Sequence, residues 1–184
     1  MGEQHKKHNR REHLNDFHLN VAGEYVYDGA LYACQNDDAK QRRSKRAVWG
    51  MAAILTVAVA AGGCIPAPGM QNCFYVLLPY LGEFLGAASV IWALAKLGTD
   101  WSTVREYNYK KSVAVLPVRT AVTAVFSLLG IVCELIFFFV NDHAGQTFFA
   151  LLYVLLKLIA LLSVLVLRAE IMQAEWDKLP KKNN

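Results

Sequence analysis

The sequence predicts an all-α protein, a bundle of four transmembrane helices with both chain termini in the cytoplasm. Hydrophobic residues make up 55% of the 184 residues and charged residues only 18%, and the mean hydropathy of +0.25 exceeds that of an ordinary soluble domain. The apolar residues lie in four long stretches, each close to the roughly 20 residues that a helix needs to cross a bilayer. Basic residues flank these stretches on one side only. This pattern excludes a large soluble core and a second folded domain.

The four predicted helices form a transmembrane domain over residues 47–169. They are expected at 47–64, 73–97, 114–140 and 147–169. An N-terminal segment, 1–46, precedes the domain and ends in a basic stretch at 40–46, which would contact anionic lipid headgroups. A C-terminal tail, 170–184, follows. Short loops join the first two and the last two helices, so each of these pairs is expected to be antiparallel neighbours.

The distribution of basic residues predicts the orientation of the chain. Seventeen of the nineteen Lys and Arg residues lie on one side, in 1–46, 96–113 and the tail from Arg168 onward. The two loops on the other side, 65–72 and 141–146, have none. Positive residues are retained on the cytoplasmic side, which predicts a cell membrane protein (inner or plasma membrane) with both termini inside. The net charge of +4 therefore reflects topology and does not indicate a nucleic-acid partner.

The N-terminal segment is predicted to contain a β-hairpin at 19–34. Polar and apolar residues alternate here, and an Asp-Gly dipeptide at 28–29 suits the positive φ angles of a two-residue type I′ turn. This turn would place Tyr25 opposite Tyr32 and bring Tyr25, Tyr27 and Tyr32 to one face. An isolated hairpin is only marginally stable in water, so the face needs a surface to lie on. That surface is either the lipid headgroup layer or a docked protein partner.

A proline-set turn is expected at 65–72, flanked by Cys64 and Cys73. Both cysteines fall on the predicted outer side of the membrane, where disulfide bonds form in many cells. Their spacing allows a Cys64–Cys73 disulfide, and the alternative is two small apolar thiols at helix ends. The chain has no Cys-x-x-Cys motif, which argues against a thiol oxidoreductase.

Ionisable residues within the predicted helices are the most informative ones for function. A charge at membrane depth costs roughly 3 kcal/mol or more, so such residues normally face the bundle interior and pair. At about 1.5 Å per residue, Glu83 and Lys157 are expected at roughly 14 Å from the outer boundary and Glu134 at roughly 9 Å, so the three charges can meet. The Tyr153 hydroxyl is expected to hydrogen-bond near Lys157. Arg119 lies near the cytoplasmic boundary and can extend to the headgroups.

Each predicted helix has a face of small or polar residues that should point into the bundle. On the third helix, one polar stripe falls within an arc of about 80° and comprises Arg119, Thr123, Ser127, Gly130 and Glu134. On the second helix, Gly82 and Gly86 flank Glu83 and permit close approach of a neighbouring helix. The first helix repeats small residues every four positions, at Ala52, Thr56, Ala60 and Cys64. The fourth presents Ala150, Tyr153, Lys157, Ala160 and Val164 on one face.

The sequence predicts a non-enzymatic membrane protein without a cofactor. It has no visible hydrolytic triad, metal-ligand cluster or phosphate-binding loop. The expected partners are the lipid bilayer and either another membrane protein or a second copy of the chain. One hypothesis is an accessory or interaction subunit of a membrane complex that docks through its tyrosine-rich face. The alternative is a small oligomeric transporter coupled to protons or cations through Glu83, Glu134 and Lys157.

Overall fold

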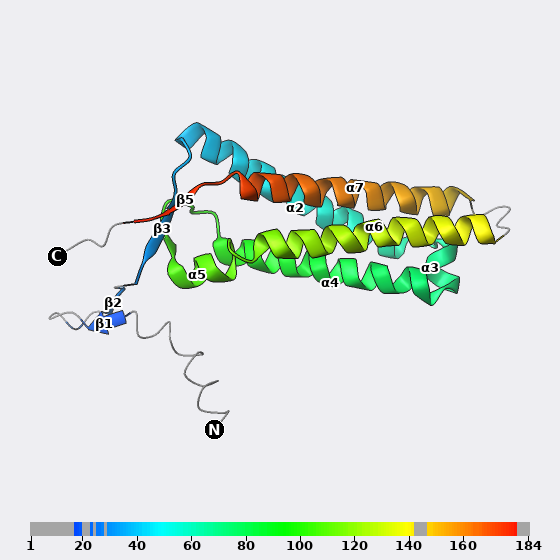
Figure 1. The fold of residues 1–184 in the computed structure, drawn as a ribbon, viewed down its shortest axis with the longest axis horizontal. Helices are drawn as coiled ribbons and strands as arrows, with labels where there is room; N and C mark the ends of the chain where they lie inside the picture. The colour runs from blue at the N-terminus through cyan, green and yellow to red at the C-terminus, as the bar shows by residue number, and fades with distance from the viewer. Residues whose placement is uncertain (1–16, 20–22, 24, 28, 142–146, 180–184) are drawn as a thin grey trace, which may run out of the picture.

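A computed structural model describes residues 17–19, 23, 25–27, 29–141 and 147–179. Four long helices form a bundle (Figure 1), namely α2 (Asp38–Cys64), α4 (Phe74–Leu97), α6 (Leu116–Val140) and α7 (Thr147–Met172). Two short helices, α3 (Pro68–Asn72) and α5 (Glu106–Lys111), lie at opposite ends of the bundle. The structure has four helices that are long and apolar enough to span a membrane, so the predicted four-helix bundle is confirmed.

The long helices follow one another around the bundle in the order α2, α7, α6, α4. Helix α7 packs extensively on both α2 and α6, and α6 packs extensively on α4, whereas α2 and α4 contact each other much less. Helices α4 and α7 therefore lie diagonally across the bundle. Residues on these two helices can meet only through side chains that reach the bundle centre.

The outer surface of the bundle is apolar, as contact with lipid requires. Large side chains such as Leu85, Leu155 and Leu162 are more than half exposed along the helices. Near one end of α4, the exposed Trp92 lies beneath Lys96, whose Nζ is 5.3 Å from the ring centroid. A tryptophan beside a lysine of this kind is typical of the membrane–water interface.

A small β-sheet closes the bundle at the end where both described termini lie (Figure 1). Its central strand β3 (Leu31–Cys34) pairs antiparallel with β4 (Val104–Arg105) on one side and β5 (Trp176–Lys178) on the other. These three strands come from the N-terminal segment, the α4–α6 connection and the C-terminal tail. We call this end of the molecule the sheet end and the opposite end, which carries α3, the α3 end. The structure therefore contains a three-stranded sheet that the predicted all-α fold did not include.

The sheet is anchored by a hydrophobic cluster that continues from the bundle. Trp101 is 1% exposed and lies against Trp176, with ring centroids 5.8 Å apart. The same cluster includes Leu97, Leu116 and Leu167 from three of the long helices. The Cys34 N–H donates a hydrogen bond to the Trp101 carbonyl at 3.0 Å, which attaches β3 directly to the connection between α4 and β4. Strand β3 of the N-terminal segment is therefore part of the folded core at the sheet end.

The predicted pairing of the N-terminal hairpin is wrong. Strand β2 (Tyr25–Tyr27) pairs with the preceding strand β1 (Phe17–Leu19), so that Tyr25 lies opposite Leu19. Tyr32 lies opposite Val104 and Lys178 in the other sheet. The positive φ angle occurs at Gly23, whereas Gly29 has none and so does not form a type I′ turn. The long-range partners of β3 offered hydrogen bonds and aromatic packing that a local hairpin did not.

Helix α2 also differs from the prediction at its start and in its buried face. It begins at Asp38, so the basic stretch 40–46 is its first part and not a separate linker. Its small residues Thr56, Ala60 and Cys64 are exposed, although Ala52 is buried. A repeat of four residues advances 40° beyond a full turn, so the stripe winds away from the interior. The face that packs inward comprises Val48, Ala52, Leu55, Ala58, Val59 and Gly62.

Candidate functional site

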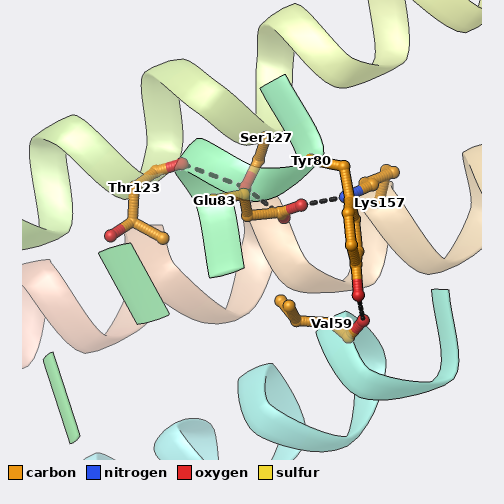
Figure 2. A network of polar contacts seen from close by, with 6 residues as sticks. All are labelled: Val59, Tyr80, Glu83, Thr123, Ser127 and Lys157. Atoms are coloured by element: carbon orange, nitrogen blue, oxygen red, sulfur yellow. Dashed lines mark hydrogen bonds and ion pairs between the residues drawn. The ribbon is translucent and has the colours of Figure 1, made fainter. Parts of the chain in front are cut away.

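Glu83 on α4 and Lys157 on α7 form an ion pair in the centre of the bundle (Figure 2). The side chain of Glu83 is completely buried and that of Lys157 is 2% exposed. The two residues come from diagonal helices, so the pair crosses the whole interior. The structure thus brings together two of the three charges that the sequence places at similar depth.

Helix α6 supplies the second partner of the Glu83 carboxylate. The Ser127 hydroxyl lies 2.6 Å from Glu83 Oε1 and donates to it, while Lys157 holds Oε2. Ser127 also lies 3.1 Å from the carbonyl oxygen of Thr123, one turn earlier, as Figure 2 shows. Both carboxylate oxygens therefore have a donor, which a buried charge requires.

Two tyrosine rings enclose the Lys157 ammonium group. Its Nζ lies 4.5 Å from the ring centroid of Tyr80 on α4 and 5.0 Å from that of Tyr153 on α7. Both distances are within the range of cation–π attraction. The Tyr80 hydroxyl donates to the Val59 carbonyl on α2 at 3.4 Å (Figure 2). Tyr80 therefore links α4 to α2, at the side of the bundle where these helices have little other contact.

Glycines make room for this network. A Cβ at Gly130 would lie 3.7 Å from Lys157 Cε, so the lysine stem passes directly over this position. A Cβ at Gly86 would lie 2.5 Å from Thr123 Oγ1, and one at Gly82 only 2.5 Å from a ring carbon of Phe126. Helices α4 and α6 approach as closely as the Gly-x-x-x-Gly spacing predicts.

Glu134 does not join the ion pair, contrary to the expected meeting of three charges. It is completely buried on α6, and its Oε1 accepts a hydrogen bond from the Gly69 N–H of α3 at 3.4 Å. Its Oε2 has no hydrogen-bond partner within the described part of the chain. Lys157 reaches Glu83 instead, because Glu83 lies at nearly its own depth and is also held by Ser127.

Tyr153 and Arg119 also differ from their expected roles. Tyr153 presents its ring to Lys157, and its buried hydroxyl has no partner among the described residues. Arg119 is half-buried and donates from Nη1 to the Ser89 carbonyl of α4 at 2.6 Å, so it bridges two helices besides lying near the sheet end. Its guanidinium therefore has a structural role between α6 and α4.

The three tyrosines of the expected interaction face have separate environments. Tyr25 is 76% exposed. Tyr27 donates to the Ala30 carbonyl at 3.3 Å, with the Arg105 guanidinium 5.3 Å from its ring centroid. Tyr32 stacks on Tyr109 of α5, with ring centroids 4.2 Å apart and an interplanar angle of 6°. Only Tyr25 remains available as an open contact.

Cys64 and Cys73 are free thiols in the structure, the first exposed and the second half-buried. Among the described residues, no group of three or more His, Cys, Asp or Glu side chains is arranged to hold a metal ion. The interior site therefore consists of carboxylates, an ammonium group and hydroxyls.

Two residues of this site were not anticipated from the sequence. Tyr80 precedes Glu83 by three positions and so shares its helix face, a spacing that could have identified it. Gly69 lies in the connection between α2 and α4, where no periodic pattern indicates which atom meets the bundle. No family model, curated protein or solved structure matches this chain.

Proposed function

We propose that this chain is a small transporter coupled to protons or monovalent cations, which acts through Glu83, Glu134 and Lys157. One observation carries the proposal: the bundle interior holds two completely buried carboxyl groups and one buried ammonium group. With both carboxyls ionised, this interior has a net charge of minus one. An uncompensated charge in a medium of low dielectric constant is strongly unfavourable.

A ligand with a single positive charge removes this imbalance. Its arrival or departure changes the field on the nearby Glu83–Lys157 pair, which connects the diagonal helices α4 and α7. A pair of this kind is sensitive to its surroundings, because removing compensation from a buried charge costs on the order of 3 to 5 kcal/mol. Binding of a proton or monovalent cation in the bundle interior can therefore change the packing of α4 against α7.

The proposal places the protein in a cell membrane with both termini cytoplasmic. Support comes from the sequence distribution of basic residues, which are concentrated in 1–46, 96–113 and the tail from Arg168 onward and are absent from 65–72 and 141–146. We assign no catalytic activity and no nucleic-acid partner to the chain. A second copy could complete the transport unit.

Reconstitution in liposomes tests the transport proposal. The purified protein should carry a proton flux driven by an imposed potential, and Glu134→Gln should abolish it. A matched control is Glu106→Gln, which removes a partly exposed carboxylate near the sheet end and should leave the flux unchanged. Wild-type flux no greater than that of empty liposomes, with and without sodium or potassium gradients, would contradict the proposal.

An accessory subunit remains the second candidate, because Tyr25 is highly exposed on the β1–β2 pair, which projects beyond the sheet in Figure 1. Purification in mild detergent should then yield a membrane protein partner at a fixed ratio. Tyr25→Ala should release this partner. Tyr75→Ala, which changes an exposed tyrosine on α4 at the α3 end, should retain it. A chain that purifies without any partner would contradict this candidate.

A further inference from the structure

We infer that Glu134 binds a proton on Oε2 and shares it with the Tyr153 hydroxyl, in a site covered by α3. This inference deepens the proposed function by naming the ion, and its use in transport rests on that function. The binding of the proton itself is argued from geometry and can be measured separately from any flux.

Two buried polar atoms without hydrogen-bond partners lie on the adjacent helices α6 and α7 in this part of the bundle. Glu134 Oε2 and the Tyr153 hydroxyl are both fully buried, and neither has a hydrogen-bond partner among the described residues. Glu134 lies six residues before the end of α6 at Val140, and Tyr153 lies six residues after the start of α7 at Thr147. Both are therefore about 9 Å from the α3 end, on adjacent helices.

The surrounding groups offer Glu134 no positive charge. Lys157 is engaged by Glu83, and Glu83 would repel an ionised Glu134. The other polar side chains near this part of the interior bring no cationic group and comprise Tyr75 and Tyr80 on α4, Tyr153 on α7 and Cys133 on α6. A buried carboxyl without a cationic partner is stable when it carries a proton.

A proton fits the vacant oxygens better than a metal cation does. Glu134 Oε1 already accepts the Gly69 N–H, which leaves Oε2 and the Tyr153 hydroxyl as the available oxygens. Hard metal cations take about six or more oxygen ligands. A protonated Oε2, by contrast, needs one acceptor, and the Tyr153 hydroxyl, which also lacks a partner, can accept it after a side-chain rotation.

Helix α3 lies directly over this acid. A Cβ at Gly69 would lie only 2.2 Å from Glu134 Oε2 and 3.1 Å from the Phe137 ring, so any side chain here would displace the carboxyl. Pro68 and Gly69 are both buried, although they belong to a connection between helices. The backbone of α3 thus covers Glu134 at this end of the bundle, and the Gly69 N–H positions Glu134 Oε1.

Infrared spectroscopy of the full-length protein in lipid tests the inference. A protonated carboxylic acid has a C=O stretching band that an ionised carboxylate lacks and that shifts in heavy water. The wild type should show this band at neutral pH. Glu134→Gln should remove it, whereas Glu83→Gln should retain it, because Glu83 is ionised and paired with Lys157.

Two variants keep the acid and change its surroundings, so the test does not depend on the folding of Glu134→Gln. Tyr153→Phe removes the acceptor and Gly69→Ala displaces the carboxyl, and each should shift the frequency of the band. Gly50→Ala is the matched control, because nothing lies within 4 Å of the added Cβ, and it should leave the band unchanged.

Absence of the band in the wild type, or its persistence in Glu134→Gln, would overturn the inference. A band that sodium or potassium ions remove at constant pH would also overturn it, since the site would then bind metal cations. A band without proton flux would contradict transport while retaining the proton site. Proton flux without the band would support transport and overturn the proton site at Glu134.

Discussion

Lys157 and Glu83 meet across the diagonal of the bundle, on helices whose backbones are not neighbours. Each partner is nearly or completely buried, and Ser127 occupies the remaining oxygen of the carboxylate. An ion pair in this position fixes which faces of α4 and α7 point inward. Loss of one partner leaves the other charged in an apolar interior.

Replacement of Lys157 by Met should lower the free energy of unfolding by about 3 to 5 kcal/mol, because the Glu83 charge loses its compensation. Glu83→Gln in the same chain should recover much of this loss, because the two changes act on one interaction. Thermal unfolding in detergent of the single and double variants measures both effects.

The surface pair of Lys110 and Glu106 is the matched control for this comparison. Its side chains are 67% and 30% exposed, and Lys110 Nζ lies 2.6 Å from Glu106 Oε1. Lys110→Met should change stability by no more than about 1 kcal/mol. Equal effects of the two lysine substitutions would show that burial does not determine the strength of the diagonal pair.

Replacement of Gly86 by Ala should force α4 away from α6. The added Cβ would lie 2.5 Å from Thr123 Oγ1 and 3.3 Å from the Thr123 backbone Cα, which cannot move independently of its helix. We expect a loss of about 1 to 3 kcal/mol in thermal unfolding experiments. Gly50→Ala, which meets no neighbouring atom, should be neutral or stabilising by up to about 1 kcal/mol. A neutral Gly86→Ala would argue against close packing of these helices.

Replacement of Trp101 by Ala should destabilise the sheet end by about 3 to 5 kcal/mol, because it opens a cavity among buried aromatic and aliphatic side chains. No hydrogen bond is lost from the indole, whose N–H has no partner in the described segments. Membrane insertion should continue, since the apolar helices determine it. Trp92→Ala is the control, because Trp92 is 63% exposed and should affect stability less.

Asp100 should titrate below the usual range of an aspartate. Ser102 donates to Asp100 Oδ1 from its hydroxyl at 2.6 Å and from its backbone N–H at 3.0 Å, and these hydrogen bonds lower the pKa of the carboxyl. Their stabilising contribution is present at a pH above the ordinary aspartate pKa and is lost as the pH falls through the pKa of the folded state. NMR titration should show a higher Asp100 pKa in Ser102→Ala, whereas Ser102→Thr, which keeps a hydroxyl, should retain the low value.

The proposed orientation predicts the accessibility of engineered cysteines. In a variant whose four native cysteines are replaced, an impermeant thiol reagent should label a cysteine at Gln71 in intact cells. A cysteine at Thr99 should be labelled only after the membrane is opened, because the proposed orientation places the sheet end in the cytoplasm. Both original residues are exposed in the structure, so the reagent can reach either position. Labelling of the cysteine at position 99 in intact cells would contradict the proposed orientation.

The inward-facing residues of two helices, α6 and α7, could be predicted from spacing alone. Thr123, Ser127, Gly130 and Glu134 are all buried on α6, as their spacing of three or four positions indicates. The same reasoning succeeded for Lys157 and its neighbours on α7. It was wrong for α2, where a strict repeat of four small residues winds around the helix and the buried face follows bulkier side chains such as Leu55 and Val59.

The sequence by itself determined the number of long apolar helices, the position of each ionisable residue along its helix and the asymmetry of basic charge, because these depend on chain position and helix rise alone. Only the tertiary structure decided the partners. Lys157 lies within reach of two carboxylates by depth, and the diagonal arrangement of α4 and α7 together with Ser127 selected Glu83. Tyr32 likewise pairs with strands more than 70 residues away in sequence, because the sheet end offered hydrogen bonds and aromatic contacts that no local pattern encodes.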